Sequence, residues 1–134
     1  MAESNRHTRL VQALFDYVVR VYSGGDDGSV FIDDGTPRRR PPIIAGHVPD
    51  VYVPPMNSER MIIGEAETAR SLESPCTLNQ IGCLLQACEL TNKSIFILAV
   101  PWDRVRLSAS IIAHLRVNYD APTATAVVLE KLAC

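Results

Sequence analysis

A chain of 134 residues is long enough for one domain with a sizeable core, and 47% hydrophobic residues with moderate charge are typical of a globular protein, not a disordered one. No apolar run approaches the roughly 20 residues that span a bilayer, and the first ten residues lack the apolar core of a signal peptide. We therefore expect a single domain over residues 1–134, in the cytoplasm and without membrane contact.

The charge and the cysteines narrow the choice of function. A net charge of −2 is not that of a generic nucleic-acid binder, which tends to be basic. Arginine nevertheless outnumbers lysine eleven to two, and arginine is the better bidentate phosphate ligand. The cysteines show no CxxC spacing, which favours buried free thiols over a zinc site. They are Cys76, Cys83, Cys88 and Cys134.

The N-terminal part of the chain is predicted to form a helix and a short strand. Apolar side chains recur at helical spacing over residues 5–22, and a run rich in Gly and Asp ends the helix. Residues 30–32 follow as a short strand, closed by an Asp-Gly turn.

A proline-stiffened loop at residues 36–42 carries three consecutive arginines, Arg38, Arg39 and Arg40. By itself, such a run is more often a solvated group of charges than a binding site. Because it comes just before an acidic hairpin, it is also a candidate phosphate contact.

Two short apolar runs, at residues 51–53 and 61–63, are predicted to pair as a hairpin with acids at one end. Asp50 stands at the entrance of the first strand. Glu65 and Glu67 share one face of the second strand, because side chains alternate along a strand. Like charges so close together repel and raise one another's pKa. A divalent cation would relieve this repulsion, since Mg²⁺ takes carboxylate oxygens together with water and phosphate.

The C-terminal half is predicted to add two helices and two strands. Thr77 followed by Gln80 fits a capping box for a helix over 77–90. The apolar run at 94–100 suits a strand buried on both faces. Trp102 is expected to be a packing anchor at the strand–helix junction that follows, in preference to a base-stacking platform. The remaining elements are a helix over 102–116 and a strand over 125–130.

The hairpin resembles the signature of the PD-(D/E)xK nuclease superfamily, which includes many restriction endonucleases and archaeal Holliday-junction resolvases. Pro49-Asp50 matches the first half of that signature, and Glu65-Ala66-Glu67 matches the second, with Glu67 where the family usually has Lys. The order of elements is similar to the family's common core. The resemblance implies an α/β fold: a restriction-endonuclease-like mixed β-sheet flanked by helices, in the order αβββαβαβ.

The resemblance also implies an activity: an Mg²⁺-dependent (or Mn²⁺-dependent) endonuclease that hydrolyses phosphodiester bonds in DNA. It assigns Asp50, Glu65 and Glu67 as catalytic residues, and Asp50, Glu65 and the carbonyl of Ala66 as metal ligands. The nucleic-acid contacts expected beside them are Arg38, Arg39, Arg40, Arg70 and Gln80. Some family members carry a further acid on the first helix, which this chain does not clearly match, since only Glu3 and His7 are near.

Two alternatives stay open at this point. A carboxylate at position 67 cannot donate a proton or neutralise transition-state charge, so the chain could be a decayed nuclease that acts as a nucleic-acid-binding or assembly subunit. Glu65 and Glu67 could also be surface acids on an edge strand, paired with arginines such as Arg60 and Arg70. Because no separate recognition domain is predicted, sequence-specific binding would need a homodimer or a larger protein assembly.

Overall fold

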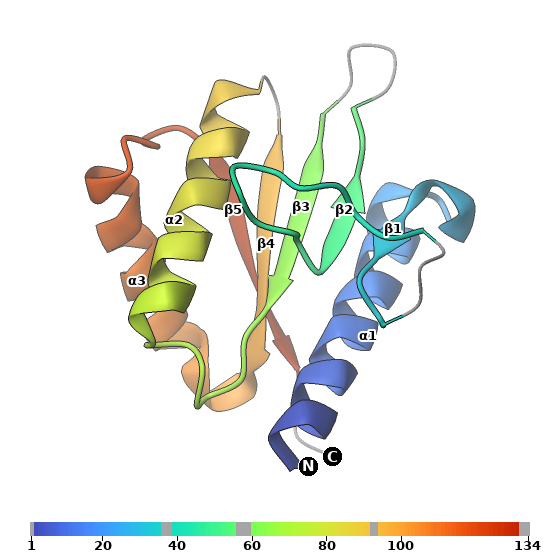
Figure 1. Ribbon diagram of the computed structural model, residues 1–134, viewed down its shortest axis with the longest axis horizontal. Helices are drawn as coiled ribbons and strands as arrows, with labels where there is room; N and C mark the ends of the chain where they lie inside the picture. Colours follow the sequence, from blue (N-terminus) through green and yellow to red (C-terminus); the bar gives the residue numbers. More distant parts are fainter. Residues whose placement is uncertain (1, 36–38, 56–59, 92–93, 132–134) are drawn as a thin grey trace.

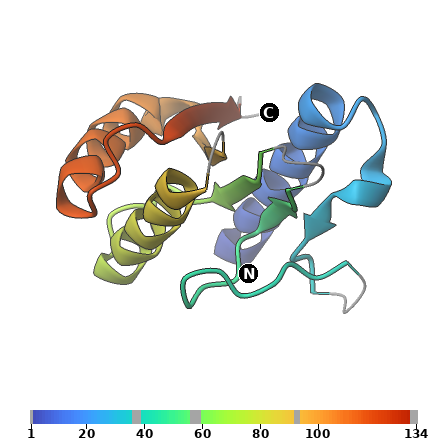
Figure 2. The same cartoon turned by 90° about the horizontal axis from the view of Figure 1, so that it is seen from above.

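The computed structural model describes residues 2–35, 39–55, 60–91 and 94–131, and the side chains of residues 2–4 and 131 lie outside that description. One five-stranded mixed sheet carries helices on both faces (Figures 1 and 2). The prediction of a mixed α/β architecture is confirmed. None of the helices in the described part of the chain combines the length and the apolar composition that crossing a membrane requires.

Each helix and strand predicted from the sequence is present, with bounds that shift by a few residues. In chain order the elements are α1 (Ala2–Tyr22), η1 (Asp27–Ser29), β1 (Phe31–Ile32), β2 (Val51–Val53), β3 (Ile62–Ala66), α2 (Pro75–Leu90), β4 (Ile95–Pro101), η2 (Trp102–Arg104), α3 (Val105–Asn118) and β5 (Thr125–Lys131), where η marks a 3₁₀ helix.

The strands lie in the sheet in the order of the sequence, β1-β2-β3-β4-β5. β1, β2 and β3 are antiparallel neighbours, and the predicted hairpin pairs Val51 with Gly64. β3, β4 and β5 are parallel, because α2 and α3 carry the chain back between them. β3 is therefore the middle strand, with an antiparallel neighbour on one side and a parallel one on the other.

The sheet divides the interior into two cores. Ile63, Phe96 and Leu98 pack with α2 and α3 on one face. Ile62 and Ile97 pack against Leu14 of α1 on the other. Alternate residues of β3 and β4 are buried on opposite faces, so β3 is buried along its whole length and β4 up to Val100, as the apolar sequence of residues 94–100 indicates for β4.

Two glycines permit close approaches that set the helix positions. A Cβ at Gly64 would lie 2.8 Å from Leu14 Cδ2, so α1 packs directly on the backbone of β3. A Cβ at Gly82 of α2 would overlap the ring of Tyr119, which follows α3. The Tyr119 hydroxyl also donates a hydrogen bond to Asn79 Oδ1 at 2.8 Å, which holds the ring on α2.

The predicted start of α2 is wrong in detail. Ser74, not Thr77, is the N-cap: its Oγ accepts a hydrogen bond from the Thr77 N–H at 3.1 Å. Pro75 takes the first helical position, where a missing N–H costs nothing. The helix therefore begins two residues earlier than expected, and Gln80 has no capping role.

The predictions for Trp102 and for some of the cysteines are also wrong. Trp102 does not pack inside the protein, since the residue is 55% exposed. Cys88 is buried as expected, and burial raises the pKa of its thiol to about 12. Cys76 is exposed and Cys83 is only partly buried, while Cys134 lies outside the described residues.

The Gly82→Ala substitution is expected to destabilise the protein by about 1–3 kcal/mol, although Ala ordinarily favours a helix over Gly, because the new Cβ would overlap the Tyr119 ring. Urea unfolding followed by circular dichroism measures the change. The matched control is the same substitution in a Tyr119→Ala background, where it should be neutral or stabilising. Equal destabilisation in both backgrounds would contradict the close approach.

Candidate active site

The predicted acids gather at the carboxyl end of the parallel strands, where ligand sites commonly lie in open α/β sheets. This is the lower edge of the sheet in Figure 1, where β3, β4 and β5 end and all three helices begin. Asp50 directly precedes β2 and stands opposite Glu65, because the next pair in the register is Val51 with Gly64. Glu67 follows β3, and its N–H donates to the Ala99 carbonyl of β4 at 3.0 Å.

All three carboxylates are largely withdrawn from water. Asp50 is 8% exposed, Glu65 2% and Glu67 8%. Glu65 lies on the middle strand of the sheet, so the alternative that these are surface acids on an edge strand is wrong. Burying carboxylates is costly unless protons, hydrogen-bond donors or cations compensate for the lost hydration.

Glu65 is the most constrained of the acids. Its Oε2 accepts a hydrogen bond from Gln80 Nε2 at 3.1 Å, whereas its buried Oε1 has no hydrogen-bond partner among the described residues. Desolvation raises the pKa of Glu65 well above its usual value, and the charges of Asp50 and Glu67 raise it further. Hydrogen bonds from the Asp50 backbone and from Gln80 oppose this shift without cancelling it. The carboxyl group is therefore poised to hold a proton or to bind a cation.

Asp50 is held from two directions. Its Oδ2 accepts a hydrogen bond from the Ala66 N–H at 2.8 Å, and His7 Nε2 of α1 lies 3.5 Å from the same oxygen. The hydrogen bond to Asp50 raises the pKa of His7, and a hydrogen bond to the Ala66 backbone adds to the rise, while desolvation opposes it. His7 thus lies beside Asp50, one of the three predicted metal ligands.

His7 is named in the sequence analysis only for its place on the first helix, and no site role was assigned to it. A signal for it exists in the sequence, because His7, Leu10 and Leu14 follow the i, i+3, i+7 spacing of one helix face. That face packs on β3, and His7 is its first polar member towards the carboxyl end of the sheet.

Glu67 is fixed by the turn that follows it. Ser71 Oγ donates a hydrogen bond to Glu67 Oε2 at 2.9 Å, and the same Oγ accepts one from the Thr68 N–H at 3.0 Å. The charge of Glu67 contributes to the raised pKa of both Glu65 and His7, so the four ionisable side chains form one electrostatic group.

The predicted nucleic-acid contacts are not brought together in the same way. Gln80 is inside the site, where it binds Glu65. Arg39 Nη1 donates to the Asp27 carbonyl oxygen at 2.8 Å and lies 3.9 Å from its carboxylate, so this guanidinium is already engaged. Arg40 and Arg70 are exposed, and Arg38 lies outside the described residues. Phosphate binding by Arg40 and Arg70 stays a prediction.

The fit of the acids to a metal ion is partial. Within residues 5–35, 39–55, 60–91 and 94–130, no three His, Cys, Asp or Glu side chains are arranged to hold one ion. Two carboxylates do face each other, and one of them has a buried oxygen without a partner among those residues. Mg²⁺ usually takes one or two carboxylates and completes its shell with water and phosphate, so this donor set suits it.

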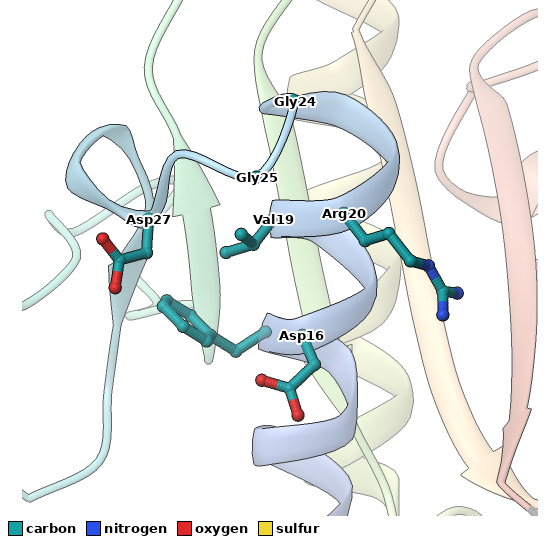
Figure 3. A pocket seen from close by; sticks show the side chains of 7 residues that line it. Asp16, Val19, Arg20, Gly24, Gly25 and Asp27 are labelled. Atoms are coloured by element: carbon teal, nitrogen blue, oxygen red, sulfur yellow. The ribbon is translucent and has the colours of Figure 1, made fainter.

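A separate hollow of about 490 Å³ lies at the other end of α1, and Figure 3 shows its lining. It is open, and Arg20 points away from Asp27 there. Thirteen residues of helix separate Arg20 from His7, roughly 20 Å. Because the hollow is remote from the buried acids, we assign the candidate site to the acids. The hollow is lined by Phe15, Asp16, Val19, Arg20, Gly24, Gly25 and Asp27.

No protein-family model, curated protein or solved structure matches this chain.

The Glu65→Gln substitution is expected to raise the free energy of unfolding at about pH 8, by about 1 kcal/mol or more, because Gln carries no charge to bury. The folded-state pKa of Glu65 is raised, so its favourable contribution is complete below the unfolded value, about pH 4, and is lost as the pH rises through the folded pKa. The advantage of the variant should therefore shrink towards about pH 4. Urea unfolding across this range in metal-free buffer measures it.

The control for this experiment is Glu73→Gln, which changes an exposed glutamate of the same strand–helix connection. It should leave the stability nearly unchanged at every pH. A stability difference for Glu65→Gln that does not vary with pH would show that the Glu65 carboxylate is solvated or already paired.

Proposed function

We propose that this protein is a divalent-cation-dependent nuclease that hydrolyses phosphodiester bonds in DNA. The observation that supports this most is the state of Glu65: it is 2% exposed, one of its oxygens has no partner among the described residues, and the charges of Asp50 and Glu67 act on it. Three buried acids at one strand end oppose folding unless a proton or a cation is shared among them. A site that keeps this arrangement is suited to a hard cation.

The architecture supports the proposal at a coarser level. One helix and three strands precede the alternation helix, strand, helix, strand, and the acids lie on the antiparallel hairpin beside a parallel neighbour. This is the element order expected of a restriction-endonuclease-like fold. We assign the chain to that fold as part of the proposal, since fold likeness alone does not establish an activity.

Asp50, Glu65 and the carbonyl of Ala66 are the groups that would hold Mg²⁺ or Mn²⁺. Gln80 binds Glu65 Oε2 and so leaves Oε1 as the oxygen available to a ligand. The Ala66 N–H orients Asp50 through Oδ2. When bound, the cation supplies Lewis acidity towards a phosphoryl oxygen and lowers the pKa of a bound water.

Glu67 and His7 complete the proposed site. The Glu67 carboxylate, fixed by Ser71, is the group that would accept a proton from the attacking water. His7 is the basic side chain that contacts the acids, and its ring N–H can donate a hydrogen bond to a carboxylate or phosphate oxygen. The chain thus has a hydrogen-bond donor at the acids although the usual Lys is replaced by Glu67.

A nuclease-fold protein that has lost catalysis and acts as a nucleic-acid-binding or assembly subunit is the alternative. Glu67 in place of Lys favours it, because a carboxylate cannot neutralise charge on the scissile phosphate. The experiments below separate the two functions.

Mn²⁺ is expected to bind the wild-type protein and to bind Asp50→Ala at least about tenfold more weakly, because Asp50 supplies one of the two facing carboxylates. Isothermal titration calorimetry at about pH 8 measures both affinities. Asp16→Ala, which removes an exposed acid of α1 away from the buried acids, is the matched control and should bind like the wild type. Equal binding by Asp50→Ala would place the cation elsewhere.

Mg²⁺-dependent nicking of supercoiled plasmid is expected from the wild type. Asp50→Ala and Glu65→Ala should reduce its rate more than about 100-fold, and Gln80→Ala about 10–100-fold, because Gln80 acts through Glu65. Asp16→Ala should nick like the wild type. Residual cation-dependent nicking by Asp50→Ala at the wild-type rate would reveal a contaminating nuclease or a different site.

Glu67 distinguishes the enzyme from the decayed alternative. If Glu67 accepts the proton of the attacking water, Glu67→Ala should lose the nicking activity. Glu67→Lys should then retain part of it, because Lys is the usual residue of the family at this position. A silent wild type that gains nicking as Glu67→Lys would indicate a decayed site. If no variant cuts plasmid, branched or single-stranded DNA, the binding-subunit function replaces the nuclease.

A further inference from the structure

Trp102 is exposed where an indole is usually covered. Tryptophan side chains are highly buried on average, because each removes a large apolar area from water. Trp102 is nevertheless 55% exposed, in the 3₁₀ helix η2 that joins β4 to α3. It is the only tryptophan of the chain. An exposed indole of this kind is available to a flat aromatic ligand.

The position of Trp102 relates it to the acids. Ala66 pairs with Ala99 in the register of β3 and β4, and the Glu67 N–H binds the Ala99 carbonyl. Trp102 follows Ala99 by three residues, which is roughly 10 Å of extended chain. Figure 1 shows the start of α3 at the same lower edge of the sheet as the end of β3. Trp102 and the carboxylates thus border one edge of the molecule.

Basic side chains flank this edge. Arg106 is exposed one turn after Trp102, and Arg70 is exposed three residues after Glu67. Arg104 lies between Trp102 and Arg106 in the chain, but its Nη1 is 3.2 Å from Asp103 Oδ2, so it is already paired. An exposed indole, together with exposed arginines in the segments that follow β3 and β4, has the composition of a surface that binds a single nucleic-acid strand, where bases stack and phosphates pair with arginine.

We propose that Trp102 is a stacking platform for an unpaired base, and that the strand engaged at this edge is single-stranded or locally unpaired. Every base offers a π-face, but in an intact duplex both faces are covered by neighbouring bases. Trp102 therefore selects strands with accessible bases without reading their sequence. This inference rests on the proposed function only for the cleavage of the bound strand. Stacking of a base on Trp102 does not require catalysis by Asp50, Glu65 and Glu67.

Intrinsic fluorescence tests the proposal directly, because Trp102 is the only source of tryptophan emission in the chain. The titration uses the wild-type protein in chelator, so that no strand is cut, with oligo(dT), oligo(U) and a DNA duplex of equal length. Single strands should quench the emission, and the duplex should quench it far less. Comparison of oligo(dT) with oligo(U) distinguishes DNA from RNA as the source of the unpaired base.

Affinity measurements with variants locate the effect. Trp102→Ala should weaken oligo(dT) binding by about tenfold or more, measured by anisotropy of a labelled strand, and Trp102→Phe should recover most of it. The slope of log affinity against log salt should stay the same, because no phosphate contact is removed. Val117→Ala, which truncates an exposed apolar residue near the end of α3, is the matched control and should bind like the wild type.

Three results would overturn the stacking proposal: no quenching by single strands, equal quenching by the duplex, or unchanged affinity of Trp102→Ala. The first would leave Trp102 as a contact for a protein partner. Failure of the proposed nuclease is distinguishable from these results. If single strands quench Trp102 but no DNA is cut in Mg²⁺, the platform stands without the nuclease. If DNA is cut but Trp102→Ala binds and cuts like the wild type, the nuclease stands without the platform.

Discussion

Burial of the Glu65 carboxyl group is the constraint around which the rest of the site is arranged. A carboxylate that is 2% exposed on the middle strand of the sheet cannot be hydrated, so every neighbouring group bears on its charge. Asp50 and Glu67 repel it, and Gln80 donates a hydrogen bond that offsets the repulsion only in part. One oxygen still lacks a partner among the described residues. A functional ligand at this position would therefore stabilise the fold as well as perform chemistry.

The two apolar cores hold this unfavourable group in place. Tight packing of α1 on β3, through Leu14 over Gly64, fixes the helix so that its first turns reach the acids. His7 then lies beside Asp50. On the other face, the Ser74 cap and Pro75 set where α2 begins, and that start places Gln80 against Glu65. Each polar contact at the site thus depends on packing several residues away.

The location of the site also follows from the topology. Parallel strands β3, β4 and β5 end at one edge, because α2 and α3 each carry the chain from that edge back to the start of the next strand. Glu67 and Ser71 lie in the connection that follows β3, and Trp102 lies in η2, which follows β4. Strand ends supply rigid positions for the acids, while the connections supply the groups that a substrate would meet first.

Local patterns in the sequence were sufficient for the secondary structure and for the hairpin. Helical and extended periodicities are properties of neighbouring residues, so the three helices, the five strands and the pairing of β2 with β3 were all predictable. The alternation of side chains also predicted that Asp50 and Glu65 meet. These predictions needed no knowledge of which segments far apart in the chain pack together.

Only the tertiary structure decided the burial and the partners of those residues. Whether β3 is an edge or a middle strand depends on its parallel pairing with β4, about thirty residues later, and that pairing is what withdraws Glu65 from water. The contact of His7 with Asp50 and of Gln80 with Glu65 likewise joins separate elements. Trp102 was expected to pack at the strand–helix junction, yet it lies in the short 3₁₀ helix η2 and is exposed. Sequence patterns report local geometry, whereas burial and charge coupling arise from contacts between distant segments.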